Sequence, residues 1–307
     1  MNRSLELREI PDLPDEIRQA ALDGDLVLFV GAGVSMLVNL PSWLSLASKA
    51  LEELRQKGFL NYSDVEQLKA LDPRKQLSIA ELICSENSIP FELAKYLTTH
   101  EVDQGIYIYL NKIGCPCVTT NYDVLLRPHY YSTKDGSSTE VPISRFDQKQ
   151  DLLAGHLNTP GTVVHLHGSV VKPETMVVTT KQYLEHYEDE TVQAFLGELF
   201  QKKTILFIGY GLEEVEILEH ILRKGRAHVT GNRRRLALMP FFISQAPLYE
   251  RLHEYYERSF GVHLIGYVRD HKDYQQLEEI MKTWSGIIEV RPTALASELD
   301  FMDEVLG

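Results

Sequence analysis

Short apolar runs recur along the chain, and a polar or glycine-containing segment follows each of them. Leu26–Val30 is apolar at every position, and Thr204–Ile208 is apolar at every position but the first. Such runs are typical of strands that are buried on both faces, as in a parallel sheet covered by helices. Four further strands are predicted, over 113–119, 161–166, 234–239 and 263–268.

Segments with the spacing of amphipathic helices separate these strands. Asp12 and Ser42 are placed to cap two of the helices, because an N-cap oxygen accepts a hydrogen bond from the first turn. The predicted helices cover 12–23, 43–57, 63–70, 75–86, 90–99, 103–111, 181–187, 190–202, 213–223, 244–259, 272–284 and 292–305. The alternation predicts an α/β fold with a doubly wound, largely parallel sheet of about six strands.

The helical pattern between the first two strands is longer than a simple crossover needs. It predicts an inserted helical subdomain over residues 36–111. Residues 1–35 and 112–290 are assigned to the Rossmann-like domain, and residues 291–307 to an acidic C-terminal helix. Residues 127–160 are polar and irregular, and they are expected to hold a hairpin or a mobile loop.

Four turns with chemical potential follow predicted strands. They are Gly31-Ala32-Gly33 with Ser35, Thr120-Asn121-Tyr122-Asp123, His167-Gly168, and Gly209-Tyr210-Gly211. In an open α/β sheet, ligands bind outside the carboxyl ends of the strands, where the strand order reverses. The four turns are therefore expected to converge on one nucleotide site.

Each turn has a structural and a functional interpretation. Glycines let the backbone approach a diphosphate, and the N–H groups of a following helix point at it. The amide of Asn121 can hold a ribose hydroxyl or a water, or it can cap a turn. His167 can act as a general base, or it can be a core histidine with a satisfied hydrogen bond. Asp123 can cap the same turn or bond to ribose or to loop N–H groups.

Charge and composition exclude several classes of function. The formal net charge is −13 and the pI is about 5.3, which disfavours sequence-independent binding to nucleic acid. The basic cluster Arg233–Arg235 is interpreted as a solvated turn. The N-terminal residues show no signal peptide, and no apolar stretch reaches the length of a membrane helix. Neither nucleic-acid nor membrane binding is expected.

The three cysteines, Cys84, Cys115 and Cys117, form no disulfide framework. Cys115 and Cys117 are interpreted as core residues, since structural zinc needs four ligands and there is no second cysteine pair. His165 and His167 lie two residues apart, but no further ligands stand near them in sequence. No metal site and no zinc are expected, and reduced thiols fit a cytoplasmic location.

The set Gly31-Ala-Gly33-Val-Ser35, Thr120-Asn121-Tyr122-Asp123, His167-Gly168 and Gly209-Tyr-Gly211 resembles the sirtuin superfamily in order and approximate spacing. Thr119–Asp123 and Pro41-Ser-Trp43 look most like the bacterial sirtuin-like, NAD-consuming proteins of phage defence. The resemblance spans about Leu26 to Gly211 and implies an NAD-binding Rossmann-like domain with a smaller inserted domain. It implies that Asn121 and His167 are catalytic. The cofactor-binding candidates are Gly31, Ala32, Gly33, Ser35, Thr120, Asp123, Gly209, Tyr210 and Gly211.

The sequence departs from the protein-deacylating sirtuins. It lacks their two Cys-x-x-Cys zinc pairs, and Leu40-Pro-Ser-Trp43 has no arginine where those enzymes carry one. The turn at Gly209 is also of a different type. The resemblance therefore favours an NAD+ glycohydrolase that releases nicotinamide and ADP-ribose, as a regulated NAD-depleting effector in anti-phage defence. The alternatives are an NAD-dependent protein ADP-ribosyltransferase or deacylase, and a non-catalytic NAD- or ADP-ribose-sensing subunit.

Regulation follows from this expected activity. An NAD hydrolase that is always active would harm its own cell. The resemblance therefore implies control through a homo-oligomer or a partner protein such as an ATPase.

Overall fold

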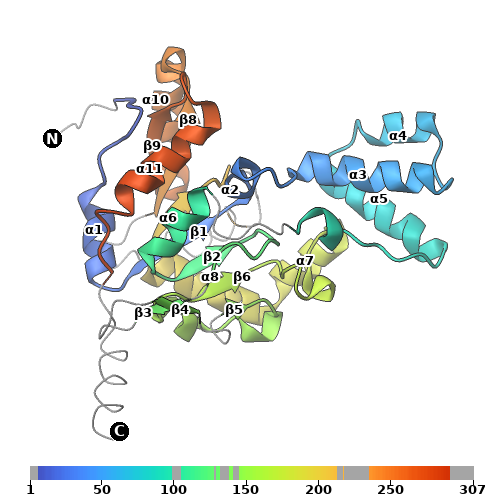
Figure 1. Cartoon of the computed structure of the whole chain (residues 1–307), viewed down its shortest axis with the longest axis horizontal. Coiled ribbons are helices and arrows are strands. Elements are labelled where there is room, and N and C mark those ends of the chain that lie inside the picture. The colour runs from blue at the N-terminus through green and yellow to red at the C-terminus, as the bar shows by residue number, and fades with distance from the viewer. Residues whose placement is uncertain are drawn as a thin grey trace, which may run out of the picture.

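The structure is a computed structural model that describes residues 6–98, 105–127, 129–131, 138–140, 145–212, 217 and 235–290. In this part of the chain, a parallel seven-stranded sheet has the order β5-β6-β2-β1-β7-β8-β9 (Figure 1). The strands are β1 Leu26–Val30, β2 Cys117–Thr119, β5 Arg145–Phe146, β6 Val163–His165, β7 Thr204–Ile208, β8 Arg235–Phe241 and β9 Val262–Val268. Without the two-residue β5, the strands run third, second, first, fourth, fifth, sixth, which is the Rossmann order. The predicted fold class is confirmed, with one strand more than expected.

β1 lies at the centre of the sheet, and its apolar run divides between two cores. Leu28 and Val30 pack in a cluster with helices α1 (Asp15–Leu22), α6 (Ile106–Ile113) and α11 (Gln276–Trp284). Val27 and Phe29 face the other way, in a cluster with α8 (Glu190–Lys202) and α10 (Ala246–Phe260). Alternate side chains of a strand point to opposite faces, so a continuous apolar run is what this doubly covered position requires.

A group of helices stands out from one end of the sheet (Figure 1). It contains α3 (Trp43–Gln56), α4 (Tyr62–Leu68), α5 (Pro73–Glu86) and the 3₁₀ turn η1 (Ala94–Tyr96). These helices share a third core cluster, to which Tyr122, Met176 and Val178 also belong. α7 (Thr180–Glu188) contacts α5 through a hydrogen bond of 3.2 Å between Ser78 Oγ and Thr180 Oγ1. The predicted boundary at residue 111 falls within α6, and the division into domains stays a prediction.

Several local predictions need correction. Ser42 caps α3 as expected, but α1 follows Pro14, and Asp12 instead pairs with Arg8. The predicted helix over 90–99 is reduced to η1, and the strand predicted from residue 113 begins at Cys117 because α6 continues to Ile113. The polar stretch 127–160 does hold a hairpin, formed by β3 (His129–Tyr131) and β4 (Ser138–Glu140).

The interpretation of Arg235 as part of a solvated turn is wrong. Its side chain is 6% exposed and donates to the carbonyl oxygens of Phe260 and Phe200. Arg233 and Arg234, most of the helix predicted over 213–223, and the helix predicted over 292–305 lie outside the described residues. The cysteine prediction is confirmed, since Cys84, Cys115 and Cys117 are free and buried. Among the described helices, none has the length and apolarity to cross a membrane.

The turns after β1 and β7 are in close backbone contact. Gly33 N donates to Gly209 O at 2.8 Å, and Gly31 N donates to Ile208 O at 2.9 Å. A Cβ on Gly209 would lie 2.6 Å from Val34 N, and Gly209 has a φ of +60°. Glycine is therefore required here by both backbone conformation and space.

We expect Gly209→Ala to destabilise the protein by more than its backbone conformation alone would. The left-handed conformation costs a residue with a Cβ about 1–2 kcal/mol, and overpacking adds about 1–3 kcal/mol. Gly58→Ala is the matched control, because Gly58 has a φ of +83° with nothing within 4 Å of its Cβ position. Urea unfolding measures both, and equal losses for the two variants would contradict the packing argument.

Candidate active site

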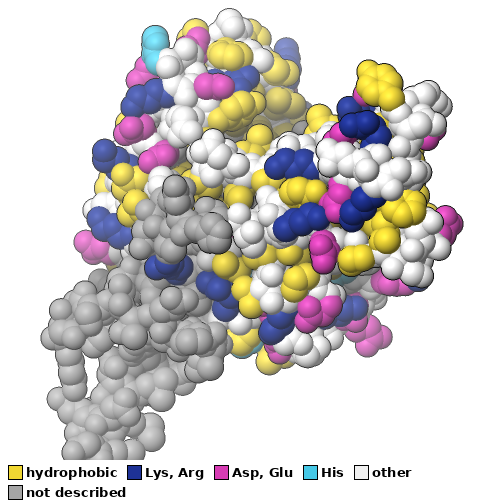
Figure 2. Space-filling view, turned by 45° about the vertical axis from the view of Figure 1, so that its right-hand side comes forward, with side chains coloured by type: hydrophobic (Ala, Val, Ile, Leu, Met, Phe, Trp, Pro, Cys, Tyr) yellow, Lys and Arg dark blue, Asp and Glu magenta, His cyan; other side chains and the backbone are white. Residues whose placement is uncertain are grey.

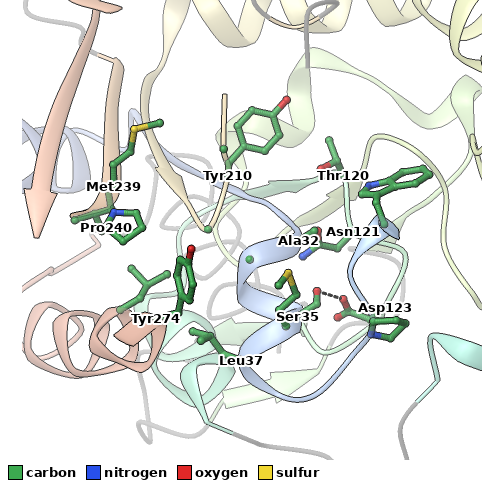
Figure 3. A pocket seen from close by; sticks show the side chains of 18 of the residues that line it. Ala32, Ser35, Leu37, Thr120, Asn121, Asp123, Tyr210, Met239, Pro240 and Tyr274 are labelled. Atoms are coloured by element: carbon green, nitrogen blue, oxygen red, sulfur yellow. Dashed lines mark hydrogen bonds between the residues drawn. The ribbon is translucent and has the colours of Figure 1, made fainter. Parts of the chain in front are cut away.

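A pocket of about 970 Å³ opens at the carboxyl-terminal edge of the sheet (Figure 3). The chain passes from β1 to β2 on one side and later adds β7 on the other side, so the strand order reverses between β1 and β7. This is the switch point at which open α/β sheets bind ligands. The volume falls within the range of ligand pockets.

The pocket brings together the predicted site residues from three of the four turns. They come from α2 (Ala32–Leu37), from the segment after β2 and from the turn after β7. Those that line it are Ala32, Gly33, Ser35, Thr120, Asn121, Asp123, Gly209, Tyr210 and Gly211. Gly31 lies next to the lining, and its carbonyl oxygen contacts Asn121. His167 has 0% exposure and is enclosed.

Asn121 is held in one orientation at the base of the pocket. Its Nδ2 donates to Gly31 O at 3.0 Å, and its backbone N–H donates to Thr119 Oγ1 at 3.0 Å. Its Oδ1 is buried and has no hydrogen-bond partner among the described residues. A buried acceptor without a partner costs free energy, so a donor supplied by a ligand or a water would satisfy it.

Asp123 is the centre of a buried polar cluster beside Asn121. Its Oδ2 accepts hydrogen bonds from Ser35 Oγ at 2.6 Å and from Tyr107 Oη at 3.3 Å, and its Oδ1 accepts from Leu125 N at 3.2 Å. Ser35 and Asp123 face each other in Figure 3. Burial and the Asp123 carboxylate raise the pKa of Tyr107 well above its usual value, so its hydroxyl remains a donor. The cluster ties α2, α6 and the segment after β2 together.

His167 lies behind an aromatic wall. Its Nε2 is 2.8 Å from Tyr187 Oη, and its Nδ1 is 3.3 Å from Tyr183 Oη. Tyr183 also lines the pocket, so its ring separates His167 from the ligand space. Burial, and then the charges of His186 and Arg74, lower the pKa of His167 well below its usual value. The imidazole is therefore neutral at pH 7.

Other pocket walls come from residues that were not among the predicted site residues, although Trp43 lies in the Pro41-Ser-Trp43 segment of the family resemblance. The guanidinium carbon of Arg74 lies 3.8 Å from the ring centroid of Tyr183, and Trp43 contacts the same ring edge-on. Across the pocket lie Met239, Pro240 and Tyr274 (Figure 3). Aromatic and apolar residues in amphipathic segments have the same pattern as core residues, so the sequence carried no signal for Met239 and Tyr274.

Comparison with known proteins accounts for the motif order. Residues 117–265 match the family model of the SIR2-like domain. The predicted resemblance to the sirtuin superfamily is thereby confirmed, because the matched range includes both Thr120–Asp123 and His167-Gly168.

Two curated relatives extend the similarity beyond the SIR2-like domain. The chain is 28% identical over 317 aligned positions to Defense-associated sirtuin 2 of Bacillus subtilis, covering 95% of this chain and 28% of that protein. It is 26% identical over 244 positions to NAD(+) hydrolase ThsA of Bacillus cereus (strain MSX-D12), covering 76% of this chain and 46% of that protein. The chain thus spans less than half of the length of either relative. Their names support the predicted defence-type branch.

We expect Asp123→Asn to lower the free energy of unfolding by about 1.5–3 kcal/mol, because the cluster loses its charged acceptor. Chemical denaturation measures this loss. Asp12→Asn is the control, since Asp12 has a side chain that is 89% exposed and, among the described residues, accepts a hydrogen bond from Arg8 in a surface ion pair. If the two variants were equally stable, the Asp123 charge would not be what holds the cluster.

We expect His186→Phe to weaken the pH dependence of the free energy of unfolding between pH 6.5 and 4. Burial lowers the pKa of His186 from 6.5 to about 4. The folded state then binds fewer protons than the unfolded state between these values, so stability is full above pH 6.5 and falls as the pH drops toward 4. The slope is about 1.4 kcal/mol per pH unit for one proton. Unfolding at a series of pH values tests this.

The control for that profile is His271→Gln, because His271 has a side chain that is 76% exposed. Its profile should follow that of the parent protein. A His186→Phe profile parallel to that of the parent between pH 6.5 and 4 would contradict the assigned burial effect.

Proposed function

We propose that the pocket binds NAD+ and cleaves it to nicotinamide and ADP-ribose. The observation that carries the proposal is the buried Oδ1 of Asn121, which has no hydrogen-bond partner among the described residues, in a pocket at the switch point of a Rossmann-ordered sheet. The names of the two relatives, a defence-associated sirtuin and an NAD(+) hydrolase, support the same activity. They also support a role as an NAD-depleting effector in anti-phage defence.

The proposed chemistry uses the charge of the substrate. Nicotinamide in NAD+ is a cationic leaving group, and it departs with the electron pair of the bond between its ring nitrogen and the ribose C1′. The remaining ribose has oxocarbenium character, and a water adds to C1′ and loses a proton to a base. Asn121 Oδ1 would accept a hydrogen bond from a ribose hydroxyl or from that water. Its bond to Gly31 O fixes the direction in which the acceptor points.

The dinucleotide is proposed to lie along the turn after β1. Ala32, Gly33, Gly209, Tyr210 and Gly211 line this part of the pocket. The N–H groups of Gly31 and Gly33 are already bonded to the β7 exit, so these glycines contribute close backbone packing against Gly209 beside the proposed diphosphate position. Ser35 and Asp123 support the site by fixing α2 through their mutual hydrogen bond.

His167 is proposed as the base, in a form of the site in which Tyr183 has moved. The enclosed imidazole has a low pKa because it is desolvated, and it is therefore a weak base. Displacement of the Tyr183 ring would connect Nδ1 with the pocket and relieve part of the desolvation. The pKa would then rise toward neutral pH, where a general base is most effective.

The helices within residues 36–111 are proposed as an inserted subdomain that shapes the nicotinamide end of the pocket. Trp43 and Arg74 contribute to this wall and contact Tyr183. Homo-oligomerisation or a partner protein such as an ATPase is proposed to control the activity, in the cytoplasm. The other candidates are transfer of ADP-ribose to protein, deacylation, and NAD sensing without turnover.

We expect Asn121→Ala and His167→Ala each to reduce NAD+ cleavage by about 10²–10⁴-fold, since a positioned catalytic group contributes that much. The assay incubates purified protein with NAD+ and follows nicotinamide, free ADP-ribose and the loss of an acylated peptide. Asn87→Ala is the control, because Asn87 is exposed, lies outside the pocket lining and uses its side chain to donate to Ile83 O. It should keep the activity of the parent protein.

The products separate the candidates. Free ADP-ribose in step with nicotinamide supports hydrolysis. ADP-ribose attached to protein would instead support an ADP-ribosyltransferase. Deacylated peptide would instead support a deacylase. Saturable NAD+ binding without turnover, in the isolated chain and in its assemblies, would contradict hydrolysis and support an NAD-sensing subunit.

A further inference from the structure

The end of α10 and the start of β9 bring together two histidines and a glutamate outside the pocket. α10 ends at Gly261, which has a left-handed conformation (φ 63°, ψ 35°), and β9 begins at the next residue. His253 and Glu257 are four residues apart on α10 and so share one face. The reversal at Gly261 places His263 of β9 against that face.

The three side chains are close enough to share a ligand. One nitrogen of each imidazole and one carboxylate oxygen of Glu257 all lie within 4.8 Å of one another. His263 Nδ1 is 3.6 Å from Glu257 Oε2, and the imidazole centroids of His253 and His263 are 4.6 Å apart. Tetrahedral bonds of about 2.0–2.2 Å place ligand atoms roughly 3.3–3.5 Å apart. Small side-chain rotations would therefore complete the site.

His253 is also oriented in the way that metal-binding histidines are. Its Nδ1 is 3.2 Å from Leu264 O and donates to it in the tautomer that leaves the lone pair on Nε2. A backbone carbonyl on the second ring nitrogen is a recurrent support of metal-binding histidines, because it fixes both tautomer and ring direction. His253 lies on α10 and Leu264 O belongs to β9. The hydrogen bond that orients His253 therefore depends on the chain reversal at Gly261.

We propose that His253, Glu257 and His263 form a binding site for a divalent transition-metal ion, with zinc as the expected ion. Two imidazole nitrogens and a carboxylate oxygen are a common three-residue zinc set, and a fourth position remains for water or another ligand. The side chains of Glu257 and His263 are each 49% exposed, so solvent reaches that position. A bound ion would clamp the last turns of α10 to β9, which is the outer strand of the sheet on this side.

The site is independent of the proposed NAD+ chemistry. None of its three ligands lines the pocket. It also differs from the cysteine-pair zinc site of the deacylating sirtuins. The sequence analysis expected no metal because neither Cys115 and Cys117 nor His165 and His167 have further ligands near them in sequence. The competing explanation is that Glu257 and a protonated His263 form only a surface ion pair.

The test is a Co2+ titration of the full chain after treatment with a chelator. Co2+ binds to zinc sites, and the bound ion absorbs visible light. We expect one saturable Co2+ per chain, displaced by zinc. His253→Ala, Glu257→Gln and His263→Ala should each weaken binding at least tenfold, since even loss of a supporting residue costs about 10–100-fold. Zinc should also raise the melting temperature of the parent protein but not of these variants.

His271→Gln is the matched control. His271 faces Glu9 in an exposed pair at 3.6 Å that has no third ligand within the part of the chain that the structure describes, and its loss should leave Co2+ binding unchanged. Melting temperatures without metal check the fold. If His253→Ala is destabilised, the half-exposed Glu257→Gln and His263→Ala variants decide. Absence of saturable binding, unchanged affinity in the ligand variants, or an equal loss in His271→Gln would overturn the site.

Discussion

The contact between the exits of β1 and β7 is the constraint on which the site depends. β1 and β7 pair with Val30 opposite Ile208, so the two strands end side by side. The hydrogen bond from Gly33 N to Gly209 O then continues their pairing beyond the sheet. A Cβ on Gly31 or Gly33 would lie 2.7 Å from Gly209 O, so side chains at these turns would separate the strands at the switch point. The sequence analysis interpreted these glycines as the residues that let the backbone approach a diphosphate. In the structure, they first allow the backbones after β1 and β7 to pack against each other.

The remaining polar groups are positioned from that contact. Gly31 O accepts the Asn121 amide, which joins the exit of β2 to the exit of β1. Ser35, one turn into α2, donates to Asp123 and so forms a second link between the segments that follow β1 and β2. A buried, satisfied network of this kind gives a unique geometry. In contrast to its neighbours, Asn121 Oδ1 is left without a partner among the described residues, which is why it is the atom best suited to receive a ligand.

The parts of this architecture that follow from local pattern were predictable from sequence. Apolar runs located six of the seven strands, and parallel strands necessarily place their carboxyl ends at one edge, so the convergence of Asn121 with the glycine turns could be inferred. The burial of the site residues and their hydrogen-bond partners could not be predicted in this way. His167 is shielded by Tyr183 and Tyr187, and Tyr107 bonds to Asp123 from α6, yet tyrosines in helices look like ordinary core residues. The His253, Glu257 and His263 set depends on the reversal at Gly261, which becomes visible only when helix and strand boundaries are known.

The enclosure of His167 separates binding from turnover in the proposed function. Asn121 already lines the pocket, whereas His167 is enclosed and contacts Tyr183, whose ring lines the pocket. Tyr183 is held by Arg74 of α5, and α5 is joined to α7 by the hydrogen bonds between Ser78 and Thr180. A cation–π contact of this kind contributes about 0.5–2 kcal/mol, which is small enough for binding of a substrate or a partner to displace. A pocket that can hold NAD+ before its base is exposed would bind substrate while remaining inactive. An NAD-depleting protein needs that property, because unregulated cleavage would harm the cell that contains it.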